Sequence, residues 1–295
     1  MDGHRIKQTP ILVLIATQPR LDCLLTVSLP SIAAQTRPAD RVVIVSDKQA
    51  LSVSDVKRIK SIVTTVEVIV LHNKQLAGAA GSWNTGIDYI NEHYDSGFVA
   101  VLDDDDYWDN HHLALCEQEA HNAQLVISGI KMINNGQVIT PKMPTQLTSE
   151  DFLIGNPGWQ GSNTFIDLKL LNHAGKYSNG LVSCNDRDLA IRVLDLFPLI
   201  AFTGQATVNW NINHRDDALS AVRSSQKLKG VCQFYQRYQQ RMNLKQKEQF
   251  FNRIEKLFKW TRDEIEKELR TITSEQSTKP FYNKKNSHNP KYPSA

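Results

Sequence analysis

The sequence predicts an α/β fold built around a largely parallel sheet, and two patterns support this prediction. Short apolar runs that suit buried strands alternate with longer patterns that suit helices, and such alternation gives right-handed βαβ units. The runs cover residues 11–16, 41–46, 66–71 and 98–102. Polar side chains follow the runs, and the carboxyl ends of parallel strands meet at one edge, where open sheets of this kind bind ligands.

The helices between these runs are recognised by their breakers and their spacing. Pro19 ends the first strand, and apolar residues then recur at helical spacing from Leu21 to Ile32. Helical patterns also follow the second strand, over 54–63, and the third strand, over 77–94. The carboxyl edge of the sheet should therefore gather these side chains: Thr17, Asp47, Asn73 and the aspartates of residues 103–106.

The four adjacent carboxylates of residues 103–106, called here the aspartate run, are the strongest functional signal in the chain. They follow a buried strand and repel one another, so folding alone does not favour this placement. A cation or a ligand rich in hydrogen-bond donors would offset the repulsion, and hard divalent cations bind oxygen ligands of this type. A solvated acidic loop at a strand end is the alternative.

The segment after the aspartate run predicts a helix and a hairpin. The helix is expected over 109–121, with His111 and His112 in an exposed first turn. Two strand patterns, 124–133 and 137–140, are separated by the turn sequence Asn-Asn-Gly. Such a hairpin suits a sheet whose second half is mixed rather than parallel.

Three further segments carry polar residues in a definite pattern. Residues 155–164 combine turn formers with an aromatic ring and several amides, which is unusual for a passive connection. A helix begins at Asn185 with acids in its first turn, where the helix dipole favours them. A strand pattern over 208–213 leads to His214.

Composition is that of an ordinary globular chain, with 41% hydrophobic and 22% charged residues. The longest apolar run is far too short to span a bilayer, and the first residues lack a secretory pattern, so a cytoplasmic enzyme is expected. The cysteines have no paired spacing that would suggest zinc or a disulfide framework, so reduced thiols are expected. They are Cys23, Cys116, Cys184 and Cys232.

Charge separates the C-terminal end from the rest of the chain. Residues 224–295 hold 16 Lys and Arg against 7 Asp and Glu, which leaves −6 on residues 1–223 because the whole chain carries +3. We therefore expect an α/β domain over 1–223, a helical extension with an aromatic seam over 224–273, and a disordered basic tail over 274–295.

The order of these features resembles the family 2 glycosyltransferases, which have the GT-A fold with a Rossmann-like mixed sheet. The resemblance is carried by the polar strand ends, by the glycines of residues 78–86, by residues 102–106, and downstream by residues 175–177 and 185–189. It covers most of the chain up to the helical extension. It implies a glycosyltransferase domain of the GT-A class over residues 1–223.

The resemblance implies a set of donor contacts. Asp103 and Asp105 match the family's Asp-x-Asp motif, in which the first acid contacts the donor ribose and the second holds a divalent cation, Mn²⁺ or Mg²⁺, on the diphosphate. Such a cation offsets the charge that builds on the departing nucleoside diphosphate, while Asp106 would orient ligands or loop amides. Asp47 is expected to read the base. The other expected nucleotide-sugar contacts are Thr17, Asn73, Gly78, Asn84 and Asp104.

The resemblance also implies residues that act on the acceptor. Asp186 is expected to be the general base, which takes the hydroxyl proton as that oxygen attacks the anomeric carbon in line with the leaving diphosphate, and Asp188 is the second candidate. A well-capped helix start is the structural alternative for both acids. His214 is expected to complete the metal or diphosphate site. Sugar or acceptor contacts are expected from Trp159, Gln160, Ser162 and Asp188.

Three functions are consistent with these features. The first is a metal-dependent, inverting transferase that moves a sugar from a nucleoside-diphosphate donor, UDP-linked in particular, to a glycan or lipid-linked hydroxyl acceptor, as in bacterial surface-glycan assembly. The second is a catalytically silent GT-A domain that binds nucleotide sugars or glycans, because Ser46, Trp83 and Asn185 depart from the family's pattern. The third, a phosphatase with an Asp-x-Asp nucleophile, is disfavoured because that motif usually follows the first strand of its domain.

The basic C-terminal residues lie beyond every residue expected in the chemistry, so location or assembly is their expected role. An anionic membrane attracts such a segment by about 1 kcal/mol per basic residue, which suits a cytoplasmic enzyme at the inner face of the membrane. Helices over 224–273 that cap the domain or pair two subunits are the alternative. Nucleic acid is disfavoured as a partner, because acids and bases are interspersed over 245–270.

Overall fold

The computed structural model of the chain describes residues 9–18, 21–212 and 221–277. Within these residues one sheet has the strand order β3-β2-β1-β4-β8-β6-β9-β5, with β7 paired to β6. The strands are β1 (Ile11–Thr17), β2 (Arg41–Ser46), β3 (Val68–His72), β4 (Phe98–Asp103), β5 (Tyr107–Trp108), β6 (Leu125–Asn134), β7 (Gln137–Ile139), β8 (Thr164–Asp167) and β9 (Ile200–Asn211). The first four are parallel, whereas β8 runs antiparallel to β4, so the sheet is mixed as the GT-A resemblance implied.

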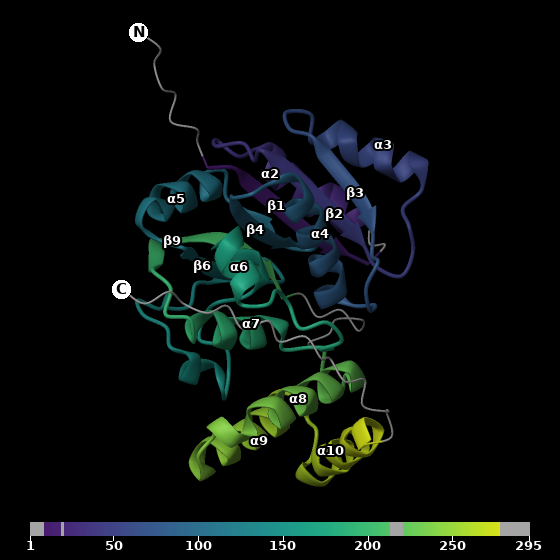
Figure 1. The fold of residues 1–295 in the computed structure, drawn as a ribbon, viewed down its shortest axis with the longest axis vertical. Helices are drawn as coiled ribbons and strands as arrows, with labels where there is room; N and C mark the ends of the chain where they lie inside the picture. Colours follow the sequence, from purple (N-terminus) through teal and green to yellow (C-terminus); the bar gives the residue numbers. More distant parts are fainter. Residues whose placement is uncertain (1–8, 19–20, 213–220, 278–295) are drawn as a thin grey trace, which may run out of the picture.

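Helices cover both faces of this sheet (Figure 1). One face packs against α1 (Leu21–Cys23), the π-helix η1 (Leu24–Ser28), α2 (Leu29–Ala33), α3 (Val53–Ile62) and α5 (His112–Glu119). The other packs against α4 (Ala79–His93), α6 (Leu168–His173) and α7 (Asn185–Leu194). Successive side chains of a strand point to opposite faces, so β1 sends Leu12 and Leu14 into the α4 side and Val13 and Ile15 into the α2 side. Burial on both faces explains why the strand reads as a continuous apolar run.

The C-terminal helices lie beyond α7 at one end of the molecule (Figure 1). They are α8 (Ser225–Tyr238), α9 (Leu244–Phe258) and α10 (Arg262–Ser277). Their buried side chains, including Val231, Phe234 and Phe250, belong to the same hydrophobic core as Leu189 and Ile191 of α7. The helices that were predicted for this part of the chain are confirmed, and they pack directly on the α/β layer. No helix in the described residues is long and apolar enough to cross a membrane.

The described structure differs from the sequence predictions at a few places. β8 and α6 were not predicted, and α10 continues to Ser277, past the expected start of the tail at residue 274. The rest of the tail lies outside the described residues, and the boundary between residues 223 and 224 stays a prediction. The hairpin of β6 and β7 is confirmed.

The exposed position that was predicted for His112 is wrong. His112 is 1% exposed, its Nδ1 lies 2.7 Å from Thr207 Oγ1, and its ring stacks on Trp108 with centroids 4.5 Å apart. Burial lowers the pKa of His112 to about 3, so the ring is neutral at physiological pH. Trp108 lies in the core beside it and is 2% exposed.

Close packing of α4 on the sheet gives a prediction about stability. A Cβ atom at Gly86 would lie 2.3 Å from Leu14 Cδ1 and 3.2 Å from Val45 Cγ2. We expect Gly86→Ala to lower the free energy of unfolding by about 1–3 kcal/mol through overpacking, measured by denaturant unfolding. Glu92→Ala on the exposed side of α4 is the control, and an unchanged midpoint for Gly86→Ala would contradict the packing described here.

Candidate functional site

The aspartate run alternates between buried and partly exposed side chains at the end of β4. Asp104 and Asp106 are 1% and 3% exposed, whereas Asp103 and Asp105 keep part of their surface accessible. Thr17 Oγ1, at the end of β1, donates a hydrogen bond of 2.5 Å to Asp104 Oδ2. Two predicted donor contacts, Thr17 and Asp104, are thus brought together at the carboxyl edge, and the acids with accessible surface are those of the Asp-x-Asp pattern.

Ser162 connects two of these aspartates. Its hydroxyl donates to Asp106 Oδ2 (2.6 Å) and accepts from the Asp103 backbone N–H (3.1 Å), while its carbonyl accepts from Trp108 Nε1 (2.7 Å). Asp106 Oδ1 also accepts from the Asn211 backbone N–H (3.1 Å). Ser162 was predicted to contact sugar or acceptor, and the structure shows it binding the aspartate run from within the protein. Asp106 holds a backbone amide, as its expected orienting role requires.

The carboxylates raise one another's proton affinity. Burial and then the charges of Asp106, Asp105, Asp186 and Asp104 raise the pKa of Asp103 well above its ordinary value. Burial, followed by the charge of Asp105, raises the pKa of Asp106 to about 8 against the two hydrogen bonds that it accepts. Because the charge of Asp186 contributes to the raised pKa of Asp103, the first turn of α7 lies near the aspartate run.

Asp186 has the properties of an accessible base. It lies in the first turn of α7, and burial raises its pKa to about 6, while the charge of Lys227 from α8 acts in the opposite direction. No hydrogen bond to its carboxylate is found within the described part of the chain. The carboxylate is therefore ionised at neutral pH and available to a proton donor. Lys227 was not predicted from the sequence.

Asp188, two positions further, is fully engaged by the protein. It is 0% exposed and accepts hydrogen bonds from Ser178, Arg192, Arg237 and Tyr238. Burial acts to raise its pKa, but the two arginines and the Ser178 hydroxyl outweigh it and hold the pKa below the ordinary value. Asp188 is thus held by the protein, whereas Asp186 has no hydrogen bond within the described residues; the base role of Asp186 and acceptor contact by Asp188 stay predictions.

Asp47, Asn73 and Gly78 form one network at the ends of β2 and β3. Asp47 is 2% exposed; its Oδ1 accepts from Asn73 Nδ2 (2.8 Å) and its Oδ2 accepts from the Gly78 backbone N–H (2.9 Å). Gly78 precedes α4 with φ 123°, a conformation that favours glycine. The carboxylate therefore fixes the start of α4, whose positive dipole end lies at this edge. Base recognition by Asp47 stays a prediction.

Asn84 links α4 to the segment that leads into α7. It is 5% exposed, its Nδ2 donates to the Tyr177 carbonyl (2.8 Å), and its Oδ1 accepts from the Tyr177 N–H (3.0 Å). Trp83 packs against the Tyr177 ring at 4.4 Å between centroids. The amide of Asn84 thus holds the backbone at Tyr177, and its contact with a donor stays a prediction.

The expected sugar contacts around residue 160 are largely internal. Trp159 is 1% exposed, and its Nε1 donates to Thr164 Oγ1 (2.8 Å). Gln160 is partly exposed, and its backbone N–H donates to Asn163 Oδ1 (2.7 Å). Stacking of a sugar on Trp159 would require the ring to leave the core. His214 lies outside the described residues.

The aspartate run fits a divalent cation in charge and in ligand chemistry, though not as a complete coordination sphere. Burial and then the neighbouring charges raise the pKa values of Asp103 and Asp106, and a cation would relieve the repulsion between these groups. Within residues 9–18, 21–212 and 221–277, no group of three or more His, Cys, Asp or Glu is arranged to hold a metal. A cation here would take only part of its shell from Asp105 and its neighbours, and ligand phosphates and water would complete it, which is common for Mg²⁺.

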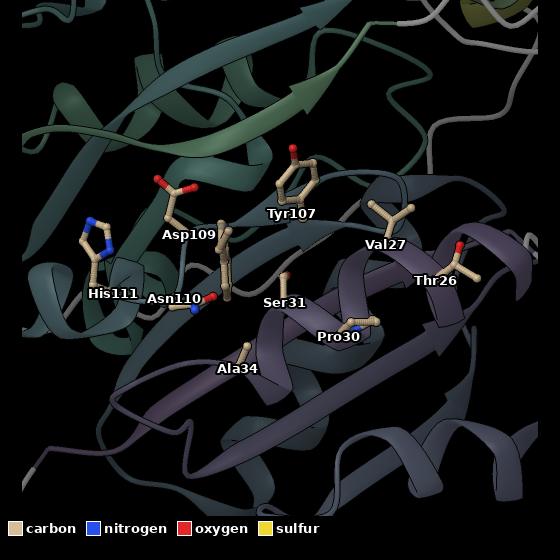
Figure 2. A pocket seen from close by; sticks show the side chains of 10 residues that line it. Thr26, Val27, Pro30, Ser31, Ala34, Tyr107, Asp109, Asn110 and His111 are labelled. Atoms are coloured by element: carbon tan, nitrogen blue, oxygen red, sulfur yellow. The ribbon is translucent and has the colours of Figure 1, made fainter. Parts of the chain in front are cut away.

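A cavity of about 620 Å³ lies between η1 and α2 on one side and the segment after β4 on the other (Figure 2), and the aspartate run is not among its lining residues. It is lined by Thr26, Val27, Pro30, Ser31, Ala34 and residues 107–111. A second cavity of about 470 Å³ lies between α8 and α10. Neither is lined by a residue that was predicted for the site.

The bonds of Ser162 give a prediction with a matched control. Ser162→Ala leaves a buried carboxylate without its hydroxyl donor, so we expect the free energy of unfolding to fall by about 1–3 kcal/mol. Ser128→Ala is the control, because the Ser128 hydroxyl is buried without a partner and its removal should be neutral or stabilising. Chemical denaturation of both variants checks this, and equal losses would contradict the role given to Ser162.

The sequence was compared with protein-family models and with curated proteins. The family model described as glycosyl transferase family 2 matches residues 13–175, which include most of β1, all of β2 to β4, the aspartate run and Ser162. No curated protein sequence matches the chain significantly.

Solved structures of TarS from S. aureus resemble the chain over most of its length. TarS 1-349 in complex with UDP-GlcNAc aligns with a TM-score of 0.54 at 16% identity, covering 93% of each chain. The same portion in complex with UDP gives a TM-score of 0.53, also at 16% identity and 93% coverage of each chain. A longer TarS chain gives 0.52 at 18% identity, covering 86% of this chain and 44% of that one. At these identities the likeness concerns the fold.

Proposed function

The chain belongs to glycosyl transferase family 2 and is a glycosyltransferase, and we propose that it moves a sugar from a nucleoside-diphosphate donor to a hydroxyl acceptor in a metal-dependent, inverting reaction. The observation that carries this proposal is the effect of the Asp186 charge on the pKa of Asp103, which indicates that the first turn of α7 lies near the aspartate run. It supports a single site with two functions. Asp186 would take a proton from the acceptor, and the nearby aspartate run would bind the donor through a cation.

The chain's own residues have distinct roles in this proposal. Asp103 contacts the donor ribose, Asp104 and Thr17 hold the edge of the nucleotide site, and Asp105 is the metal ligand. A bound Mn²⁺ or Mg²⁺ ion supplies Lewis-acid stabilisation of the departing diphosphate. Asp186 accepts the acceptor hydroxyl proton on its carboxylate as that oxygen attacks the anomeric carbon. One base and one displacement give inversion.

UDP is the donor nucleotide that we favour, because two of the similar structures contain UDP or UDP-GlcNAc. The acceptor that we propose is a glycan or a lipid-linked sugar, because the basic helices α8 to α10 suit an anionic membrane surface nearby. A panel of nucleotide sugars, incubated with and without Mn²⁺ and followed for release of the nucleoside diphosphate, tests the donor and the metal together. Binding without turnover for every donor and acceptor would indicate the silent binding domain instead.

The metal role of Asp105 gives a prediction about binding. Addition of Mn²⁺ should increase the affinity of the wild type for the nucleotide. In Asp105→Asn this increase should be about 10–100-fold smaller, because a cation ligand is lost, while the fold persists. Isothermal titration with UDP at fixed Mn²⁺ measures this. Asp95→Asn, in the loop before β4, is the matched control. The same response to Mn²⁺ in both variants and in wild type would exclude Asp105 as the ligand.

The base role of Asp186 gives a prediction about turnover and its pH dependence. Asp186→Asn should keep donor affinity while kcat falls roughly 10²–10⁴-fold. A base must be ionised, so wild-type kcat should decline as pH falls through about 6, the raised pKa of Asp186, and the variant should lack this decline. Asp195→Asn, at the other end of α7, is the control. A full effect in Asp188→Asn alone would reverse the assignment.

A further inference from the structure

Helix α8 lies directly on the segment that leads into α7. A Cβ atom at Gly230 would lie 2.1 Å from Ser183 Oγ, so the helix backbone touches this segment without an intervening side chain. Gln233 Oε1 accepts from the Val182 N–H (3.1 Å), and its Nε2 donates to the Gly180 carbonyl (3.3 Å). The conformation of residues 180–183 therefore depends on α8.

Asp188 is the point at which α7 and α8 are joined by charge. Arg237 Nη1 donates to Asp188 Oδ1 (2.5 Å), and Tyr238 Oη donates to the same oxygen (2.9 Å). Arg192 and Ser178 bind Oδ2 at 2.8 Å and 2.7 Å. A carboxylate with no exposed surface needs such partners, and the last turn of α8 supplies two of these four donors.

Arg187 joins the same turn of α7 to α8 from another direction. Its guanidinium lies 4.1 Å from the Phe234 ring centroid and 5.6 Å from that of Phe250. It also donates to the Phe152 and Leu153 carbonyls at 2.9 and 2.8 Å. The two residues that follow Asp186 in the chain are thus both fixed by the C-terminal helices, whereas Asp186 itself has no hydrogen bond within the described residues.

We propose that α8 is a positioning element of the catalytic centre, in which Arg237 and Tyr238 act through Asp188 to hold the first turn of α7 and thereby Asp186. This inference rests on the proposed function and extends it to residues outside the matched family region. The rate of a reaction depends strongly on the position of its catalytic groups, since a displacement of about 1 Å can lower the rate roughly 10²-fold. The C-terminal helices therefore serve the chemistry in addition to any role in location or assembly.

Arg237→Ala tests the proposal with Arg241→Ala as a matched control. Both arginines tie the C-terminal helices to α7, but Arg241 pairs with Asp195 at the far end, and the two side chains are similarly exposed, at 33% for Arg241 and 44% for Arg237. We expect kcat at saturating donor to fall about 10–100-fold in Arg237→Ala, with the donor KM and UDP affinity within about twofold of wild type. Arg241→Ala should keep kcat within about twofold.

Two conservative variants separate positioning from general stability. Tyr238→Phe keeps the ring and removes one hydrogen bond to Asp188, so a smaller loss of kcat is expected. Arg237→Lys retains the charge but not the planar guanidinium, whose Nη1 donates to both Asp188 Oδ1 and Ser178 Oγ, and it should recover part of the activity lost in Arg237→Ala. An unchanged kcat in Arg237→Ala, an equal loss in Arg241→Ala, or a KM that rises in step with the fall in kcat would each overturn the proposal.

Amide hydrogen exchange gives a readout that needs no turnover. In the full-length Arg237→Ala protein, exchange at residues 185–189 should accelerate, whereas in Arg241→Ala the change should stay near Asp195. Unchanged exchange at residues 185–189 overturns the positioning by α8. If wild-type protein transfers no sugar from any donor while the exchange change is present, the transferase proposal fails and the structural coupling stands.

Discussion

Repulsion among carboxylates at the end of β4 is the constraint around which the carboxyl edge is arranged. Asp104 and Asp106 are turned inward, and each receives hydrogen-bond donors from a different element: Thr17 of β1, Ser162 of the turn at 161–163, and the Asn211 backbone of β9. Each such bond offsets part of the cost of burying a carboxyl group. Elements that are far apart in the chain are thus held at one edge of the sheet, because they donate hydrogen bonds to the buried aspartates.

The sheet was largely predictable because its central strands are buried on both faces. Runs such as residues 11–16 consist entirely of apolar residues. This pattern can be recognised in the sequence without knowing which strands lie next to the run. β8, by contrast, spans Thr164–Asp167 and is defined by pairing with β4 and β6. His112 is similar: its burial depends on Trp108 and on Thr207, a contact across the fold that local periodicity does not contain.

The candidate site was predictable to the extent that its chemistry is local. Acids at a strand end and at a helix start point to the aspartate run and to α7 from their positions alone. Sequence order does not show which of Asp186 and Asp188 is engaged, because Arg237 and Tyr238 come from α8. Nor does it show that the Ser162 hydroxyl lies between Asp103 and Asp106, which requires the turn at 161–163 to be placed against β4.

Gly230 has a consequence for how such enzymes can be recombined. Since the α8 backbone meets Ser183 with no room for a side chain, the helices and residues 178–188 fit each other as one unit rather than as two exchangeable modules. A chimaera that joins a different C-terminal region at residue 224 would also need the matching version of residues 178–188. That exchange would include the position of Asp186. A junction that leaves this packing intact therefore lies before residue 178, well upstream of the boundary that charge composition marks.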